Sequence, residues 1–354
     1  MPTRFVSILA VILFSVAGSL PVRAHAPLSP AAQVVGNGHP ETCTQENLFA
    51  ALDLGGAITF NCGAAPTAIF FNTAKTISTS ASLYGADRIT LSGNNVTRLF
   101  VVNGGISLTL SHIALSNASS AGDGGAIINN SGATLIIDHA TFRHNVTDSV
   151  SSGGAIVNLG SLSISDSTFD SNQAGNGGAV YPRFSASRTT IANSLFIHNS
   201  TLNTTDGWGG AMLIWDGAPV TVQGSQFISN SARWGGVFYV FANSSLTLTS
   251  SLLSYNLADS GSTSDDGGGG AIYSNARLVL RDTHIEDNLT VVPPGFGFFG
   301  KRAGGAILND SAGVVQMSGG ALSRNRALHG GALYSLGNGS IISATLADNL
   351  AGRG

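Results

Sequence analysis

The sequence contains few charged residues, since Asp, Glu, Lys and Arg make up only 10% of its 354 residues. The formal net charge is -3 and the basic residues form no cluster, which argues against a nucleic-acid partner. Disordered chains combine low hydrophobicity with high net charge, whereas 43% of these residues are apolar. Helix formers at helical spacing are nearly absent after the first fifty residues. Abundant Gly, Ser, Thr and Asn instead favour many short strands joined by tight turns.

Cysteine is equally scarce, with only Cys43 and Cys62. In an oxidising compartment such an isolated pair is predicted to form a disulfide. Closing a loop of this length would stabilise the fold by roughly 3 kcal/mol. The alternative is two buried free thiols. A metal site would need further ligands close by in the sequence, so we predict neither a metal nor a cofactor.

The N-terminal segment is typical of a secretory signal. Arg4 supplies a positive charge, residues 5–16 form an apolar run, and small residues precede a cleavage site after Ala26 or, because Pro27 follows, after Ala24. The run is shorter than the roughly 20 residues of a membrane-spanning helix, and no later segment could cross a bilayer as a helix. We therefore predict a signal peptide over 1–26, a linker over 27–40, and a secreted or bacterial cell-surface protein.

Two short motifs recur through most of the chain. A Gly-Gly pair followed by a small and then an apolar residue occurs eight times. The pairs begin at Gly124, Gly153, Gly177, Gly209, Gly235, Gly269, Gly304 and Gly330. An Asn with a large apolar residue three positions before it follows each small residue after 17 to 20 residues. These motifs are Phe142/Asn145, Phe169/Asn172, Phe196/Asn199, Phe227/Asn230, Leu253/Asn256, Ile285/Asn288, Leu322/Asn325 and Leu346/Asn349.

Such a repeat predicts a solenoid of stacked parallel strands. Strands about 4.8 Å apart would place equivalent residues in ladders. In this arrangement Gly-Gly forms a corner, the Phe ladder fills the interior, and the Asn ladder hydrogen-bonds along the stack. Alternating stretches such as 135–137 and 162–164 are typical of the connecting strands. We predict an all-β parallel β-helix of about eleven coils, roughly 50 Å long.

The pairing of Gly-Gly-Ala-Ile with Phe-x-x-Asn resembles the repeats of chlamydial polymorphic outer-membrane proteins and related bacterial β-helix proteins. Residues 43–62 resemble the leading segment of exported bacterial right-handed β-helix proteins. Right-handedness and a bacterial surface setting are what this resemblance implies. It covers most of residues 40–354, with N-terminal capping and degenerate coils over 41–123 and the regular repeats over 124–354. Many activities share this fold, so the motifs identify an architecture rather than a function.

Length variation is confined to one part of the repeat. The spacing from each Asn to the next Gly-Gly ranges from 5 to 16 residues. The longer segments, 200–208, 257–268 and 289–303, are therefore predicted to emerge along one edge of the rod. The last contains Phe296, Phe298 and Phe299, which either fold back over the coil or contact a partner.

All three tryptophans lie within residues 208–234. Trp208 and Trp234 each precede a Gly-Gly, so the register places them one above the other on neighbouring coils. The candidate ligand-binding residues here are Trp208, Trp215, Trp234, Asp206, Asp216 and Arg233. Stacked rings with a polar rim suit a sugar, although a stacking pair that only stabilises the corner is favoured. A second column lies two residues after each small residue and faces either inward or outward. It contains Tyr181, Leu213, Tyr239, Tyr273, Leu308 and Tyr334.

An enzyme is the alternative, because parallel β-helices often host polysaccharide lyases and hydrolases. Asp138-His139 locally resembles a pectate lyase motif, but it occupies an ordinary repeat position near which other coils place Asp166, Asn193 and Asp282. Asp259, Asp265 and Asp266 could bind calcium weakly, although a solvated loop is favoured. We predict no catalytic residue.

Gly354 stands where the next Gly-Gly is expected, so we expect a further coil or a cap from a partner beyond it. The predicted function is a surface-displayed or secreted scaffold that binds a glycan or a host or cell-surface protein through one edge. The oligomeric state is not specified by the sequence.

Overall fold

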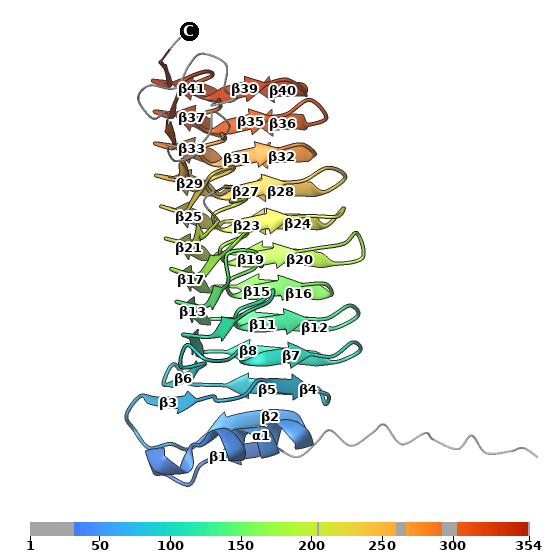
Figure 1. The fold of residues 1–354 in the computed structure, drawn as a ribbon, viewed down its shortest axis with the longest axis vertical. Coiled ribbons are helices and arrows are strands. Elements are labelled where there is room, and N and C mark those ends of the chain that lie inside the picture. Colours follow the sequence, from blue (N-terminus) through green and yellow to red (C-terminus); the bar gives the residue numbers. More distant parts are fainter. Residues whose placement is uncertain (1–31, 204, 260–266, 292–302, 353–354) are drawn as a thin grey trace, which may run out of the picture.

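The computed structural model describes residues 32–203, 205–259, 267–291 and 303–352. Over these residues the chain winds into the predicted parallel β-helix (Figure 1), with four sheets running along the rod. Each regular coil contributes one strand to sheets C, A, B and D in that order. Figure 1 shows the strands of sheets A and C side by side and those of sheet B across the rod from them.

In each coil the chain passes from sheet C to sheet A and then to sheet B. The strands of sheet A are β1 (Gln33–Val35), β2 (Gly56–Phe60), β5 (Ala81–Tyr84), β8 (Ser107–Ser111), β12 (Thr134–Asp138), β16 (Ser161–Ser165), β20 (Arg188–Ala192), β24 (Pro219–Gln223), β28 (Ser245–Thr249), β32 (Arg277–Arg281), β36 (Val314–Ser318) and β40 (Asn338–Ile342). Those of sheet B are β3 (Thr67–Phe70), β6 (Ile89–Ser92), β9 (Ala114–Ser116), β13 (Thr141–Arg143), β17 (Thr168–Asp170), β21 (Leu195–Ile197), β25 (Gln226–Ile228), β29 (Leu252–Ser254), β33 (His284–Glu286), β37 (Ala321–Ser323) and β41 (Thr345–Ala347).

Sheets C and D flank the Gly-Gly corner. The strands of sheet C are β4 (Lys75–Ile77), β7 (Phe100–Val102), β11 (Ile127–Asn129), β15 (Ile156–Asn158), β19 (Val180–Pro182), β23 (Met212–Ile214), β27 (Phe238–Val240), β31 (Ile272–Ser274), β35 (Ile307–Asn309) and β39 (Leu333–Ser335). Those of sheet D are β10 (Ser119–Ser120), β14 (Val146–Thr147), β18 (Gln173–Ala174), β22 (Ser200–Thr201), β26 (Ser231–Ala232), β30 (Leu257–Asp259), β34 (Leu289–Val291), β38 (Arg326–Ala327) and β42 (Leu350–Ala351).

The stacking is in strict register, as the repeat predicts. Leu135 of β12 pairs with Leu162 of β16, and Phe142 of β13 pairs with Phe169 of β17. Alternate side chains of sheets A and C point inward and form ladders of mostly aliphatic residues, while sheet B contributes the Phe ladder. The eleven strands of sheet B agree with the predicted number of coils.

The two predicted ladders form the corner between sheets B and D. The rings of Phe142, Phe169 and Phe196 are fully buried and lie parallel, with centroids 4.6 to 4.7 Å apart. On the same coils each Asn side chain bonds to the next, and Asn172 Nδ2 donates to Asn199 Oδ1 at 3.0 Å. These bonds satisfy amide groups at a bend that the sheet ladders do not reach.

Both glycines of each Gly-Gly pair are required by the backbone. Gly153 has a φ of 72°, in the left-handed region that disfavours other residues. A Cβ atom at Gly154 would collide with the carbonyl oxygen of Gly178 on the next coil. The corner between sheets D and C therefore keeps the same narrow geometry from coil to coil.

The N-terminal end of the described rod is covered by a helix that the sequence reasoning did not predict. The 3-10 turn η1 (Pro40–Thr42) leads into helix α1 (Gln45–Leu54), which lies across β2 (Figure 1). The Thr44 side chain accepts from the Asn47 N–H at 3.3 Å, and the helix buries Leu48 and Leu52 against the first coils.

The segments flanking α1 are covalently joined. Cys43 and Cys62 form a disulfide with their Cα atoms 5.7 Å apart. Strand β1 lies within residues 27–40, for which only a linker was expected. The predicted signal peptide lies outside the described residues.

Candidate functional site: an aromatic belt on sheet C

The outer face of sheet C carries a second apolar cluster, separate from the interior. The residue after each small residue, such as Val180, points into the main core. The next residue points away from it, because strand residues alternate between faces. Tyr181, Tyr239 and Tyr273 are nevertheless only 7 to 8% exposed, and aromatic rings pack against Tyr239 and Tyr273. The Tyr column is therefore on the outside of the sheet but covered.

The covering rings form what we call the aromatic belt. It consists of Trp208, Trp215, Trp234, Tyr239, Phe241 and Tyr273. The Trp208 and Trp215 rings are stacked with their centroids 5.4 Å apart, and Trp215 stacks on Phe241 at 3.7 Å. Tyr239 and Tyr273 stack at 4.5 Å beneath them. The three tryptophans are partly exposed, so the belt offers flat ring surface to solvent.

The tryptophan register was predicted correctly, but the ring partners were not. A bridge pairs the Trp208 and Trp234 backbones on neighbouring coils. However, Trp208 packs against Trp215 and Tyr239, whereas Trp234 meets Tyr273 edge-on. Backbone register fixes the position of the Cα atom, whereas packing against neighbouring side chains determines the orientation of the ring.

An ion pair lies at the edge of the belt. Arg183 Nε donates to Asp216 Oδ2 at 2.8 Å, and both side chains are about one-third exposed. This hydrogen bond raises the pKa of the Arg183 guanidinium above its usual value. At the other edge, the Tyr273 hydroxyl donates to the Asp310 carboxylate. The belt is thus rimmed by both donors and acceptors.

Of the other two predicted rim residues, Asp206 lies near the belt and Arg233 lines a separate hollow. Asp206 is exposed two residues before Trp208, and its negative charge helps to raise the pKa of Tyr239. Arg233 donates to the Thr205 carbonyl oxygen and lines a hollow of about 270 Å³ beside sheet D. Asp259 lines the same hollow. Arg233 therefore lines this hollow, whereas the adjacent Trp234 belongs to the aromatic belt.

Burial changes the acidity of the tyrosines below the belt. Loss of solvent raises the pKa of Tyr181 and of Tyr239 to about 12 in each case. The pKa of Tyr273 is raised further, by burial and by its hydrogen bond to Asp310. All three phenols are neutral at physiological pH and act as hydrogen-bonding, apolar supports for the rings above.

The motif that resembled a pectate lyase is an ordinary corner of the coil. His139 follows β12 with a φ of 47°, and Asp166, Asn193 and Asp282 occupy the same left-handed position in later coils. In the described residues, the carboxylates at the rim of the belt are engaged with Arg183 and Tyr273. These observations give no support to a catalytic assignment. Phe296, Phe298, Phe299, Asp265 and Asp266 lie outside the described residues.

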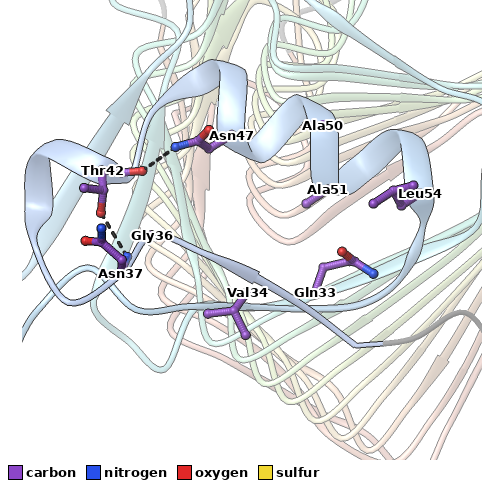
Figure 2. A pocket seen from close by; sticks show the side chains of 9 residues that line it. All are labelled: Gln33, Val34, Gly36, Asn37, Thr42, Asn47, Ala50, Ala51 and Leu54. Atoms are coloured by element: carbon purple, nitrogen blue, oxygen red, sulfur yellow. Dashed lines mark hydrogen bonds between the residues drawn. The ribbon is translucent and has the colours of Figure 1, made fainter.

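A further hollow lies at the N-terminal end of the described rod, far from the belt. It measures about 440 Å³ and lies between β1 and α1 (Figure 2), with Val34, Asn47 and Leu54 among its lining residues. Asn47 Nδ2 donates to the Thr42 carbonyl oxygen at 2.8 Å, which ties the start of the helix to the preceding turn. Among the described residues, no helix has the length and apolar character needed to cross a membrane.

The comparisons agree with the repeat architecture. The family model of the Chlamydia polymorphic membrane protein repeat matches residues 166–181. This segment runs from the corner before the Phe ladder to the following Gly-Gly and Tyr181. The chain is thus a β-helix repeat protein similar to the polymorphic membrane proteins.

One curated relative is the metabotropic glutamate receptor-like protein R of Dictyostelium discoideum. It is 26% identical over 254 residues, which are 70% of this chain and 14% of that protein. The chain therefore spans about one-seventh of the length of this relative. No solved structure matches the chain.

Several residues of the site were missed from the sequence. Arg183 was missed, because its partner Asp216, which was predicted, lies on the neighbouring coil and no short motif links the two. Phe241 follows β27 by one residue and carried no repeat signal. The available signal was clustering, since Phe241 lies close in sequence to the three tryptophans and packs in the same cluster.

Proposed function

We propose that the chain is an exported scaffold, secreted or displayed on a bacterial surface, that binds carbohydrate through the aromatic belt without catalysing a reaction. The predicted signal peptide and the similarity to polymorphic membrane protein repeats support export and surface display. The adhesive role is our inference from the belt itself.

The observation that carries the proposal is the stacked, partly exposed group of Trp208, Trp215 and Phe241. Flat rings pack well against the C–H faces of a sugar ring, while adjacent polar groups bond to its hydroxyls. Arg183 and Asp216 supply such groups at 2.8 Å from each other beside the rings. The stacked strands beneath fix all of these side chains in advance, which lowers the entropic cost of binding.

A glycan array probed with the purified chain tests the proposal. We expect Trp215→Ala to weaken binding about tenfold or more, because a lost ring contact costs on the order of 1.4 kcal/mol. Phe70→Ala is the matched control, since Phe70 is 60% exposed on β3 and lies outside the belt. Equal loss in both variants, or no glycan bound at all, would contradict carbohydrate binding at the belt.

Reducing-sugar and lyase assays on polygalacturonate and related polymers test the non-catalytic part. We expect binding without turnover. Turnover that a single acidic substitution such as Asp138→Asn abolishes would support a polysaccharide lyase or hydrolase instead. Binding of a purified surface protein, but of no glycan, would assign the belt to protein recognition.

A further inference from the structure

A pair of stacked histidines stands at the corner between sheets A and B, remote from the belt. His112 and His139 occupy the same corner position in successive coils, and their rings are parallel within 9° with centroids 4.7 Å apart. Both residues have left-handed backbones, and their N–H groups donate to Asp138 and Ser165 carbonyl oxygens on the next coil. The stack of coils therefore fixes the two imidazoles one above the other.

Two carboxylates accompany the histidines. Asp138, the last residue of β12, has its Oδ1 atom 3.1 Å from His139 Nδ1. One donor atom each from His112, Asp138 and His139 lies within 4.8 Å of the other two. Asp87 lies on the preceding coil, with its carboxylate oxygens 3.0 and 3.1 Å from His112 Nδ1.

This set of side chains has the chemistry of a metal site. Imidazole nitrogen and carboxylate oxygen together suit zinc and similar divalent cations better than magnesium or calcium, which prefer oxygen alone. We propose that His112, Asp138 and His139 bind a divalent cation of the zinc class, with Asp87 orienting His112. When Asp87 accepts the Nδ1 proton of His112, the Nε2 lone pair is free to bind the cation, as in other carboxylate-oriented histidine ligands.

The site needs only a small adjustment to close on a cation. Donor atoms in a tetrahedral zinc site lie about 3.4 Å apart, so the present separations must shrink by rotation of the side chains. Those side chains are 29 to 51% exposed and can rotate without disturbing the core. Ser165 holds the Asp138 carboxylate through a 2.8 Å hydrogen bond, the largest of the effects that lower the pKa of that group.

Three protein ligands leave a fourth position for water or for a donor from a partner. A hollow of about 220 Å³ lies beside sheet B, with Asp87 and His139 in its lining. A bound cation would also link the coil of β8 and β9 to that of β12 and β13. The site therefore joins the degenerate coils to the first regular repeat.

Isothermal titration of the chelator-treated full chain with Zn²⁺ tests the proposal. We expect one Zn²⁺ per chain and a rise in the thermal midpoint on binding. His139→Asn should weaken binding at least tenfold, since loss of even an outer partner costs 10- to 100-fold. Asparagine is tolerated at this corner, because Asn193 has the same backbone conformation two coils later. Mg²⁺ and Ca²⁺ should not compete.

His198→Asn is the matched control. His198 also has a left-handed backbone and is 58% exposed, with Asp170 at 3.4 Å, but it has no histidine stacked on it among the described residues. Unchanged affinity in this variant, together with the loss in His139→Asn, supports the site. Equal loss in both variants, or full affinity in His139→Asn, overturns it. Asp138→Asn provides a second test if circular dichroism shows that His139→Asn does not fold.

Discussion

Replacement of one asparagine in the buried ladder should destabilise the whole rod. Asn199 is fully buried at the corner between sheets B and D. Its Oδ1 atom accepts from the backbone N–H and from the Nδ2 of Asn172, both at 3.0 Å. Its Nδ2 atom donates to the Phe169 carbonyl oxygen at 2.9 Å and to Asn230 Oδ1 at 3.0 Å. Asn199→Ala removes all of these bonds and leaves the Asn172 N–H buried without its acceptor.

The magnitude follows from these contacts. At about 1 kcal/mol for each lost bond, the variant should lose about 4 kcal/mol of unfolding free energy. Urea unfolding followed by tryptophan fluorescence measures this loss, because all three tryptophans lie within the next coils. Asn338→Ala is the control, since Asn338 is exposed at the start of β40 and should change the midpoint little. Equal midpoints for the two variants would refute a stabilising role for the ladder.

Three further predictions concern the core, the corner and the tyrosines. Phe196→Ala removes a fully buried ring from the middle of the stack and should cost about 3 to 5 kcal/mol in urea unfolding. Gly154→Ala, which places a methyl group against the Gly178 carbonyl oxygen, should reduce the soluble yield and lower the thermal midpoint. Tyr181 and Tyr239 should ionise only near pH 12 in an absorbance titration, and the stability they supply should be complete below pH 10 and decline as the pH rises through 12.

Each of these predictions has a comparison that can contradict it. Phe70→Ala, on the exposed face of β3, should leave the urea midpoint nearly unchanged. Gly122→Ala meets open space, so an equal effect there would show that the Gly154 contact is unimportant. Tyrosine ionisation complete by pH 10.5 would show that Tyr181 and Tyr239 are not shielded.

The repeat itself was readable because its geometry admits few residue types. Only glycine fits the close approach at Gly154. At Asn199 the ladder needs an oxygen that accepts twice and a nitrogen that donates twice, which a side-chain amide supplies. The corner positions at His139 and Asp166 need only a left-handed backbone, which several polar residues adopt. Their side chains therefore vary between coils, and no consensus revealed that two histidines would meet.

Other features could not be predicted from the repeat spacing, because they depend on side-chain contacts between coils. The Arg183–Asp216 pair joins residues 33 positions apart, and the ring partners of Trp208 follow from Trp215 and Tyr239 rather than from its own register. Helix α1 falls outside the repeat, although Thr44 before it and Gly55 after it are typical helix ends. Neither signal belongs to the repeat, so the repeat pattern alone does not predict the helix.

The uniform corner geometry makes one coil interchangeable with another. Each rung presents the same ladders above and below, so gain or loss of a complete rung leaves matching surfaces to rejoin. Such a change alters the distance from one end of the rod to the belt by about 4.8 Å per rung. The rings of the belt contact only neighbouring rungs, and their arrangement would persist. The length of the rod can therefore change in evolution without a change in the ring surface of the belt.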